Sequence, residues 1–319
     1  DNDGWLTVFH YNGNNWIWGW SNGGSQSKGA YIYNFKNNLS SGNFNGIGGD
    51  ELIGVSSYGM RIFKYEDGDF KSMWYKTSTH SLWPYSDNLI IGDFNNDGKA
   101  DIFTYSFGGI AIYKNTSTPT TGLSFELATN MLLSYQYNGF VNLFVTTVDY
   151  PAIEDIDRDG DLDILSFFGL GTFLEHHKNF SIEKYGVPDS LDFKRVEQCW
   201  GNFAEGENNN EITLNLPCPW KCNYDTLKNS KHTGSTMLLI DLNDNGVYDL
   251  LLGDVDYSNI IALYNGGTKD SANIIAIDTA FPCYDKPIDL FTFPLAVYID
   301  VDNDGVKDLV VSPFDPNPL

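Results

Sequence analysis

Aspartate and asparagine recur along this sequence at one fixed spacing that suits metal coordination. Each copy has an acid or amide at positions 1, 3 and 5, glycine at position 6 and aspartate at position 9. The candidate ligands are Asp93, Asn95, Asp97 and Asp101 in loop B (93–101); Asp155, Asp157, Asp159 and Asp163 in loop C (155–163); Asp241, Asn243, Asn245 and Asp249 in loop D (241–249); and Asp300, Asp302, Asp304 and Asp308 in loop E (300–308). Calcium takes six to eight oxygen ligands, and carboxylates at alternate positions of a tight loop converge on one point. Glycine at position 6 permits the sharp turn, position 7 offers a backbone carbonyl, and the last aspartate closes the shell.

Surface turns rich in Asp, Asn and Gly are the ordinary alternative to a metal loop. Four intact copies with the same residue types at the same places favour the metal. A fifth copy, loop A (43–51), begins at Asn43 but has Ile47 at position 5. Because an alkyl side chain supplies no oxygen, we expect loop A to be an empty or weak site. The sequence therefore predicts about four structural calcium ions.

The segments that follow the loops are short and apolar, which indicates β-strands. Residues 102–105, 164–167, 250–252 and 309–311 are rich in aliphatic and aromatic side chains. An EF-hand would need helices on both sides and glutamate at position 12, where this chain has Thr104, Ser166, Leu252 or Val311. Many short strands in repeating units of tens of residues indicate a propeller or a solenoid.

Set between two apolar strands, these loops resemble the FG-GAP or VCBS repeat of integrin α-subunit heads and many secreted bacterial proteins. The resemblance implies an all-β propeller of four-stranded blades, in which each metal loop joins the first two strands of a blade. It also implies calcium ligands at positions 1, 3, 5 and 9 of loops B, C, D and E. Residues 150–179 and the segment from Cys199 onward further resemble large surface proteins exported by the bacterial type IX secretion route.

We expect residues 1–319 to form a single propeller domain. Motif counting gives about six blades, and the resemblance implies seven. The long interval between loops C and D leaves room for a blade without a metal loop around Arg195 to Leu216. The strands at the two ends of the chain could complete one blade and close the ring. Alternatively, the chain is a fragment of a longer surface protein.

Acidic residues outnumber basic ones by 42 to 19, which gives a formal net charge of −23. Such a surface repels phosphate backbones, and no basic stripe is present, so nucleic acid is excluded as a partner. The excess of carboxylates instead favours binding of divalent cations. No apolar run reaches the roughly 18–20 residues of a membrane helix, so we expect no membrane insertion. The chain starts at Asp1 without a signal peptide, as in a mature or trimmed form.

Four cysteines lie in the second half of the chain: Cys199, Cys218, Cys222 and Cys283. They allow three disulfide pairings, among which the sequence does not choose. Zinc is the alternative, since Cys218 and Cys222 have a tolerable ligand spacing, but no second ligand pair completes a site. Disulfides are therefore favoured, and they indicate an oxidising compartment outside the cytoplasm.

The sequence contains no G-x-S-x-G elbow, HExxH helix or Gly-rich phosphate loop. The adjacent His176 and His177 would point to opposite faces of a strand, and we interpret them as neutral surface residues. Carboxylates that hold calcium are poor general bases. We therefore expect a non-enzymatic protein, with a polysaccharide lyase or hydrolase as the alternative because calcium can polarise a substrate.

Trp16, Trp18 and Trp20 alternate at the period of a strand, which would place their three indole rings on one face. Packing between blades is one interpretation of this face. The other is a glycan-binding platform, since apolar indole faces match pyranose rings and the surrounding loops are rich in asparagine.

The sequence thus favours a secreted or cell-surface, calcium-binding module that binds a glycan or an extracellular protein. Two alternatives from other classes remain: a structural spacer within a large surface adhesin, and a polysaccharide-acting enzyme on the propeller scaffold. The fold by itself does not choose among them, because function depends on sites carried by the fold.

Overall fold

The computed structural model describes residues 7–11, 16–21, 35–47, 50–56, 59–66, 69–77, 88–168, 172–206, 210–216, 218, 234–290, 293–299 and 307–313. Within these residues the regular structure is almost entirely β-strand, joined by the short helix α1 (Ser181–Tyr185) and a 3-10 turn at Trp200–Asn202. No helix of this described part is long and apolar enough to cross a membrane. The all-β class predicted from the sequence is confirmed.

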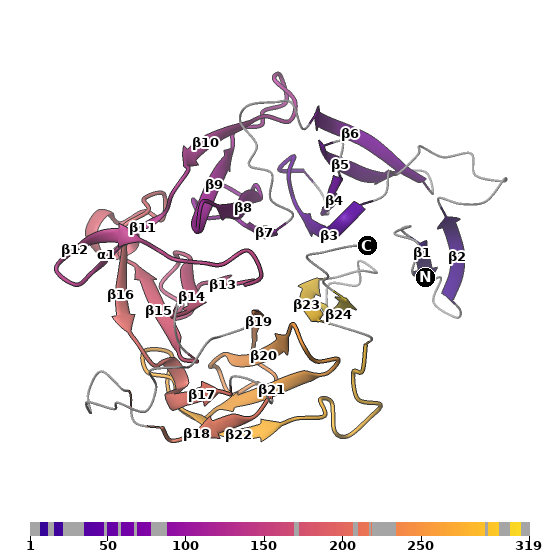
Figure 1. The fold of residues 1–319 in the computed structure, drawn as a ribbon. Helices are drawn as coiled ribbons and strands as arrows, with labels where there is room; N and C mark the ends of the chain where they lie inside the picture. The colour runs from indigo at the N-terminus through magenta and orange to yellow at the C-terminus, as the bar shows by residue number, and fades with distance from the viewer. Residues whose placement is uncertain are drawn as a thin grey trace.

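Four propeller blades, each of four antiparallel strands, surround a common centre (Figure 1). Blade A contains β3 (Phe35–Gly42), β4 (Glu51–Ser56), β5 (Gly59–Glu66) and β6 (Asp69–Thr77). Blade B contains β7 (Leu89–Gly92), β8 (Asp101–Ser106), β9 (Gly109–Asn115) and β10 (Phe125–Thr129). Blade C contains β13 (Ala152–Glu154), β14 (Asp163–Phe167), β15 (Leu174–Asn179) and β16 (Phe193–Glu197). Blade D contains β19 (Ser235–Ile240), β20 (Asp249–Asp254), β21 (Ile260–Asn265) and β22 (Ile274–Asp278).

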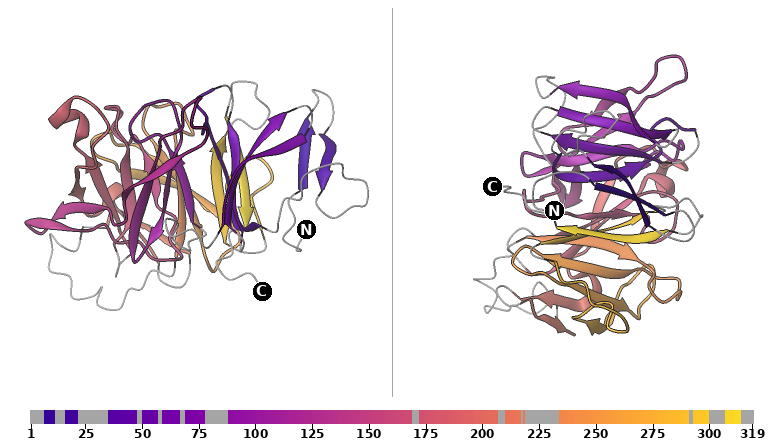
Figure 2. Two further views of the ribbon diagram at one scale, coloured as in Figure 1. Left: turned by 90° about the horizontal axis from the view of Figure 1, so that it is seen from above. Right: turned by 90° about the vertical axis from the view of Figure 1, so that its right-hand side faces the viewer.

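Two further hairpins form separate two-stranded sheets within the described residues. One consists of β23 (Pro294–Ile299) and β24 (Asp308–Pro313), which lie between blades D and A (Figure 2). The other consists of β1 (Thr7–Tyr11) and β2 (Trp16–Ser21), beside blade A in Figure 1. No pairing joins these two hairpins in the described part of the chain, so closure of the ring by the two ends stays a prediction.

The expected extra blade around Arg195 to Leu216 is not formed by the described residues of that segment. Its first part is β16, the outer strand of blade C. Its second part is the small sheet of β17 (Phe203–Glu205) and β18 (Ile212–Leu214), which packs outside blades C and D. Four complete blades are therefore present in the described residues, and the predicted count of six or seven is not confirmed.

An inserted hairpin widens blade C. β11 (Leu133–Gln136) and β12 (Gly139–Asn142) pair with one another, and β11 pairs in parallel with β16. The sheet of blade C thereby grows to six strands, and the hairpin projects from the ring in Figure 1.

Each metal-type loop joins the first and second strands of its blade, as predicted. The strand register is the same in every copy, because position 9 always pairs with the residue before position 1. These pairs are Gly42–Glu51, Gly92–Asp101, Glu154–Asp163, Ile240–Asp249 and Ile299–Asp308. The identical register shows that loops A to E are equivalent connections on successive inner hairpins.

The apolar core lies between adjacent blades. Blades A and B share a cluster that includes Ile53 and Ile102, and blades B and C share one that includes Phe103 and Ile164. A third cluster, which contains Leu250, joins blade C to blade D. Because blades B, C and D are covered on both faces, middle strands such as β20 are buried along their whole length, which explains their continuous apolar runs.

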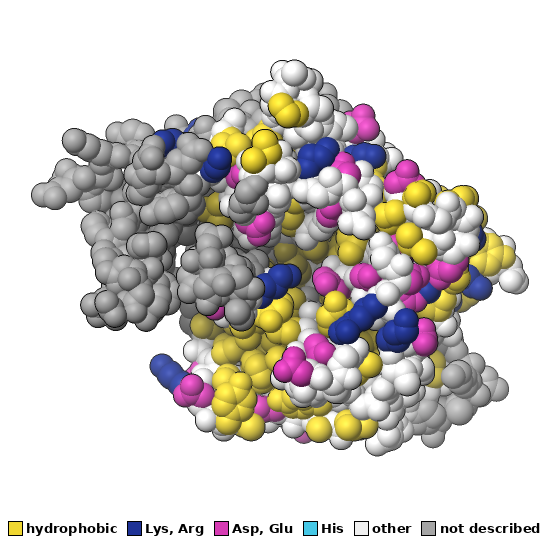
Figure 3. Space-filling model, turned by 180° about the vertical axis from the view of Figure 1, so that it is seen from behind, with side chains coloured by type: hydrophobic (Ala, Val, Ile, Leu, Met, Phe, Trp, Pro, Cys, Tyr) yellow, Lys and Arg dark blue, Asp and Glu magenta, His cyan; other side chains and the backbone are white. Residues whose placement is uncertain are grey.

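The inner strands β3, β7, β13, β19 and β23 line a central cavity of about 700 Å³. The loop ends of several blades open into this cavity, so acidic residues lie at its rim. Figure 3 shows this region hollowed, with hydrophobic, acidic and basic side chains around it.

Candidate functional site

Three described loops share one hydrogen-bonded turn built on the carboxylate at position 1. That carboxylate accepts hydrogen bonds from the backbone N–H groups of positions 5 and 6. The two distances are 3.1 and 2.7 Å at Asp93, 3.0 and 3.1 Å at Asp155, and 3.0 and 2.9 Å at Asp241. These hydrogen bonds fix the position 1 carboxylate within the turn.

Glycine at position 6 is required by the backbone conformation. Its φ angle is +82° at Gly98, +106° at Gly160 and +87° at Gly246. A side chain there would meet no neighbouring atom, so the left-handed backbone and not crowding selects glycine. The prediction that glycine at position 6 permits a sharp turn is confirmed.

In loops B, C and D the aspartate at position 9 is fully buried and clamps the loop to the blade. Asp101 accepts hydrogen bonds from the N–H of Phe94 at 3.0 Å and of Asn115 at 2.7 Å. Asp249 repeats both contacts with Leu242 at 3.0 Å and Asn265 at 2.7 Å. Burial raises the pKa of Asp101 to about 7 and also raises the pKa of Asp249. A divalent cation nearby would favour the ionised form of these desolvated carboxylates.

An asparagine that sequence reasoning missed completes each clamp at the end of the third strand. Asn115, Asn179 and Asn265 donate their backbone N–H to the position 9 aspartates, at 2.7, 2.8 and 2.7 Å. The side chains of Asn115 and Asn265 also donate to the carbonyl at position 8 of their own loops, at 2.9 and 3.0 Å. The sequence does contain a signal for this clamp, because in loops B, C and D an asparagine follows the position 9 aspartate by 14 to 16 residues.

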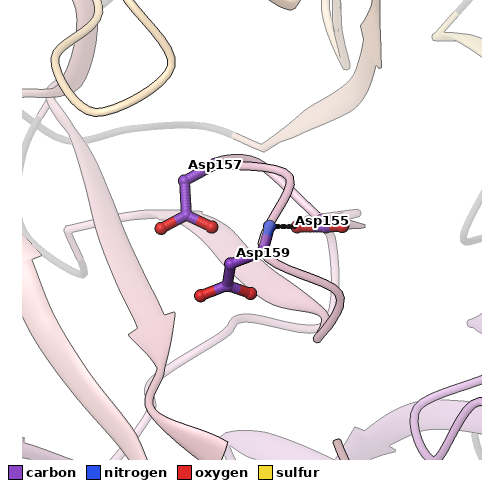
Figure 4. Close-up of side chains that lie close together, drawn as sticks. All are labelled: Asp155, Asp157 and Asp159. Carbon is purple, nitrogen blue, oxygen red and sulfur yellow. Dashed lines mark hydrogen bonds between the residues drawn. The ribbon is translucent and has the colours of Figure 1, made fainter. Parts of the chain in front are cut away.

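In loop C three candidate carboxylates converge. Oxygens of Asp155, Asp157 and Asp159 lie within 4.8 Å of one another. Figure 4 shows the carboxylates of Asp157 and Asp159 on one side of the loop, with Asp155 accepting the backbone N–H of Asp159. The fourth candidate, Asp163, is fully buried at the start of β14.

The oxygens of these loops fit a calcium ion. Asp157 Oδ1 in loop C and Asn95 Oδ1 in loop B are buried and accept no hydrogen bond. Both belong to position 3, where the sequence predicts a metal ligand. Unpaired buried oxygens are rare in folded proteins, and a hard cation would satisfy them. In loop D the side chains of Asn243 and Asn245 instead accept backbone N–H groups, at 3.1 and 2.9 Å.

Loop A differs from the other described loops at positions 5 and 9, which are Ile47 and Glu51. Glu51 takes the clamp position and accepts the N–H of Phe44 at 2.8 Å. The side-chain nitrogen of Asn45 donates to Glu51, and its oxygen accepts the N–H of Ile47 at 2.6 Å. Ile47 is 65% exposed and supplies no ligand. Whether loop A binds metal stays a prediction.

Loop E lies mostly outside the described residues, and this includes Asp300, Asp302 and Asp304. Asp308 is described and opens β24 opposite Ile299. Its backbone position therefore matches that of Asp101, Asp163 and Asp249 in their own blades.

A lysine from β15 lies among the carboxylates of loop C. Lys178 Nζ contacts Asp157, lies 2.9 Å from Asp159 and lies 2.5 Å from Glu183 of α1. Burial alone would lower the pKa of Lys178, but its hydrogen bonds to these three carboxylates together raise it. The ammonium therefore stays charged and partly neutralises the loop.

The interpretation of His176 and His177 as surface residues is wrong. Their side chains are only 6% and 1% exposed. His176 Nε2 lies 3.4 Å from Asp163 Oδ2, and His177 Nδ1 lies 2.8 Å from Ser134 Oγ on the inserted hairpin. Burial lowers the pKa of His177, which favours the neutral ring.

The central cavity contains a polar contact between two loops. Tyr248 of loop D donates from its hydroxyl to Glu154, which precedes loop C, at 3.2 Å. Burial raises the pKa of Glu154, and the nearby Lys307 opposes that rise. All three residues line the cavity, so it offers a carboxyl group, a phenol and an ammonium to a polar ligand.

One disulfide bond is present in the described part of the chain. Cys199 and Cys218 form a disulfide under β17, in a small buried cluster with Phe173 and Ala204. Cys283 is exposed and forms no disulfide, whereas Cys222 lies outside the described residues. Because Cys218 is oxidised, it is not available as a zinc ligand with Cys222.

The predicted tryptophan platform is placed only by its backbone. Trp16, Trp18 and Trp20 lie on β2 and pair with β1, but their side chains are outside the described structure.

A second aromatic group was missed in the sequence: the aromatic hairpin, formed by Tyr135, Tyr137 and Phe140 on β11–β12. These three side chains are 38%, 65% and 59% exposed, and Arg195 stacks 4.2 Å from the centre of the Tyr137 ring.

Comparison with known families agrees with this architecture. The FG-GAP-like repeat family matches residues 43–104 and 93–166, which run from loop A through the rest of blade A and blade B into β14 of blade C. The chain therefore carries FG-GAP-like repeats in a β-propeller-like arrangement. The resemblance to surface proteins of the type IX route is not tested by these matches.

No curated protein sequence matches the chain significantly. Among solved structures, it is similar to an Agrocybe aegerita lectin described in terms of specific recognition of non-reducing terminal N-acetylglucosamine. The identity is 15%, the TM-score is 0.43, and the alignment covers 87% of this chain and 74% of the lectin. It is also similar to part of the Photorhabdus luminescens Tc holotoxin pore, with 15% identity and a TM-score of 0.34. That alignment covers 86% of this chain but only 11% of the toxin chain.

Proposed function

We propose that this chain is a calcium-stabilised, non-catalytic propeller that binds a glycan or a protein outside the cell. The observation that carries the calcium proposal is the turn shared by loops B, C and D. It fixes an oxygen donor at position 1, and loops B and C add buried position 3 oxygens without hydrogen bonds. All these donors are oxygens, which is the ligand chemistry that calcium prefers.

Calcium in these loops would supply positive charge to desolvated carboxylates and would stiffen contacts between blades. Loop A accepts the N–H of Ala100 on the carbonyl of Asn43 at 2.7 Å, which joins blades A and B. Lys269 of blade D donates to the carbonyl of Asp157 at 2.8 Å, which joins blades C and D. An ordered loop therefore stabilises two blades at once.

We propose that exposed aromatic side chains bind the ligand. They form two candidate surfaces. One is the predicted platform of Trp16, Trp18 and Trp20. The other is the aromatic hairpin, whose Tyr137 and Phe140 are more than half exposed. Aromatic faces stack on the apolar faces of sugar rings and also serve as anchors in protein interfaces.

The proposed location is the cell surface or the extracellular medium, as for proteins of the type IX route. The Cys199–Cys218 disulfide supports an oxidising compartment. Extracellular calcium modules bind the ion at about 10⁻⁴–10⁻³ M, which suits loops that are partly exposed to solvent.

The first experiment is thermal unfolding in EDTA and in 10 mM CaCl₂, together with metal counting by native mass spectrometry. Calcium bound at about 10⁻⁴ M would add roughly 2.7 kcal/mol of stability per site at this concentration. Failure to bind calcium, with the same melting temperature in both buffers, would refute the metal proposal.

Ligand binding is tested on a glycan array with matched variants. Tyr137→Asn with Phe140→Ala alters the aromatic hairpin, and Trp18→Ala with Trp20→Ala alters the platform. Asn replaces Tyr137 because its φ angle is +53°, which asparagine tolerates. The control is Tyr284→Ala, since Tyr284 is 82% exposed on blade D. Loss of glycan binding in one aromatic variant but not in the control identifies the surface, and no binding by the folded wild type would favour a structural spacer.

The enzymatic alternative would use the central cavity, where Glu154 and Tyr248 are hydrogen-bonded. Burial raises the pKa of the Tyr248 phenol to about 12, so it would act as a proton donor at neutral pH. Release of unsaturated sugars from acidic polysaccharides, abolished by Tyr248→Phe, would overturn the non-catalytic proposal.

A further inference from the structure

Loop C carries more negative charge than its counterparts. Position 7 is Asp161 in loop C, but Lys99 in loop B and Val247 in loop D. Loop C also receives Glu183 from α1, a helix found only in blade C within the described residues. Five loop aspartates and Glu183 give six carboxylates, against three in each of loops B and D.

These carboxylates form two groups that share one member. Asp155, Asp157 and Asp159 have oxygens within 4.8 Å of one another, and so do Asp159, Asp161 and Glu183. The first group belongs to the predicted calcium loop. The second uses the side chain at position 7 and a residue from outside the loop, so the repeat pattern does not account for it.

Asp161 gives an independent sign that the second group receives a ligand. Its side chain is only 2% exposed. Its Oδ2 accepts the N–H of Ile182 at 2.8 Å, whereas its Oδ1 is buried and accepts no hydrogen bond. A buried carboxylate oxygen without a partner is unfavourable, and a bound cation would satisfy it.

The ammonium of Lys178 lies between the two groups and contacts carboxylates of both. Its ammonium contacts Asp157 and lies 2.9 Å from Asp159 and 2.5 Å from Glu183. With Lys178 and one divalent ion bound, three of the six negative charges would still be uncompensated. Three of these carboxylates, Asp157, Asp161 and Asp163, are no more than 5% exposed, so such an excess would be costly.

We propose that loop C holds two divalent cations bridged by Asp159. The second ion is a calcium bound by Asp159, Asp161 and Glu183. The ammonium of Lys178 competes with this ion for Asp159 and Glu183. This inference rests on the proposed calcium binding of loop C and adds one ion that loops B and D do not have.

The test is native mass spectrometry of the full chain in calcium, with the wild type compared with Glu183→Gln. Glu183 is suitable because its side chain is 38% exposed and is remote from the core. The control is Asp270→Asn, which removes one exposed carboxylate from blade D. We expect Glu183→Gln to bind one calcium fewer than the wild type, and Asp270→Asn to bind the same number.

A second variant tests the position of the ion. Lys178→Met removes the competing charge, so the Kd of the weakest site measured by calorimetry should fall roughly tenfold or more. An unchanged ion count in Glu183→Gln, with the wild type binding calcium, would overturn the two-ion site while leaving the proposed function intact. A wild type that binds no calcium at all would overturn both.

Discussion

Replacement of Asp249 by alanine separates the structural role of position 9 from its role as a metal ligand. Asp249 is fully buried and accepts two backbone hydrogen bonds, from Leu242 at 3.0 Å and Asn265 at 2.7 Å. Asp249→Ala leaves both N–H groups without their acceptor; that of Asn265 is buried and costs about 1–3 kcal/mol, whereas that of Leu242 is only partly buried and costs less. Removal of a desolvated carboxylate offsets part of this loss, because burial raises the pKa of Asp249. We expect a net destabilisation of about 1–3 kcal/mol in the absence of calcium, or roughly 2–5 °C in melting temperature for a chain of 319 residues.

The assay is thermal unfolding followed by circular dichroism, in EDTA and again in 10 mM CaCl₂. The matched control is Asn243→Ala, which removes an exposed side chain from position 3 of the same loop. Asn243→Ala should have little effect in EDTA and should reduce only the stability gained on adding calcium. Asp249→Ala should be destabilised in both buffers. Equal melting temperatures of Asp249→Ala and the wild type in EDTA would refute the clamp, since position 9 would then matter only as a metal ligand.

Two further predictions concern the buried histidine and the disulfide. Burial lowers the pKa of His177, so between pH 6.5 and the lower folded pKa the unfolded chain binds more protons than the folded one, and stability is lost on acidification. In saturating calcium, the stability of the wild type relative to His177→Gln should fall by up to about 1.4 kcal/mol per pH unit in that window, measured by urea unfolding; parallel curves would contradict the neutral buried ring. Replacement of Cys199 and Cys218 by serine opens a loop of 19 residues, which should remove about 3 kcal/mol in the same urea assay, with Cys283→Ser as a neutral control. Loss of stability on reduction of the wild type but not of the double variant would identify the Cys199–Cys218 bond as the cause.

The features that the sequence predicted correctly are local in the chain. The repeated pattern spans nine positions, and its turn is made by hydrogen bonds from the N–H groups of positions 5 and 6 to the carboxylate at position 1. The left-handed glycine at position 6 belongs to the same turn, as Gly98 illustrates. Because these interactions connect near neighbours, spacing and residue type are enough to infer them. The same holds for the strands on either side, whose apolar runs follow from burial between two blades.

The parts that were missed depend on contacts between distant segments. Asn115 and Asn265 meet their loops only after the second and third strands have folded back. Lys178 reaches loop C from β15, and Glu183 reaches it from α1. Sequence spacing alone does not show which insertion will fold over which loop. The high negative charge of loop C can be read from the sequence, but the two residues that contact it, Lys178 and Glu183, cannot be inferred from spacing.

The error over His176 and His177 has the same origin. A pair of histidines in an acidic chain is typical of a surface strand, but β15 is the third strand of its blade, and its counterparts β9 and β21 are buried in the same way. The inserted hairpin adds a partner for one of the two rings, because β11 pairs with β16 and Ser134 contacts His177. The blade count was affected by a similar insertion, since the segment after β16 forms the small β17–β18 sheet.

The proposed calcium ions would stabilise the whole ring and not only one hairpin each. Apolar clusters join the blades along their faces, and these contacts need no metal. At the loop end, the links are polar and involve the loops themselves. Arg158 of loop C lies 3.7 Å from Asp241 and 5.2 Å from the Tyr248 ring, so it joins position 4 of one loop to positions 1 and 8 of the next. Disorder in either loop would break that link, whereas calcium would order both of its ends. Metal binding at neighbouring loops should therefore be mutually supportive, because each ion stabilises the blade that presents the next site.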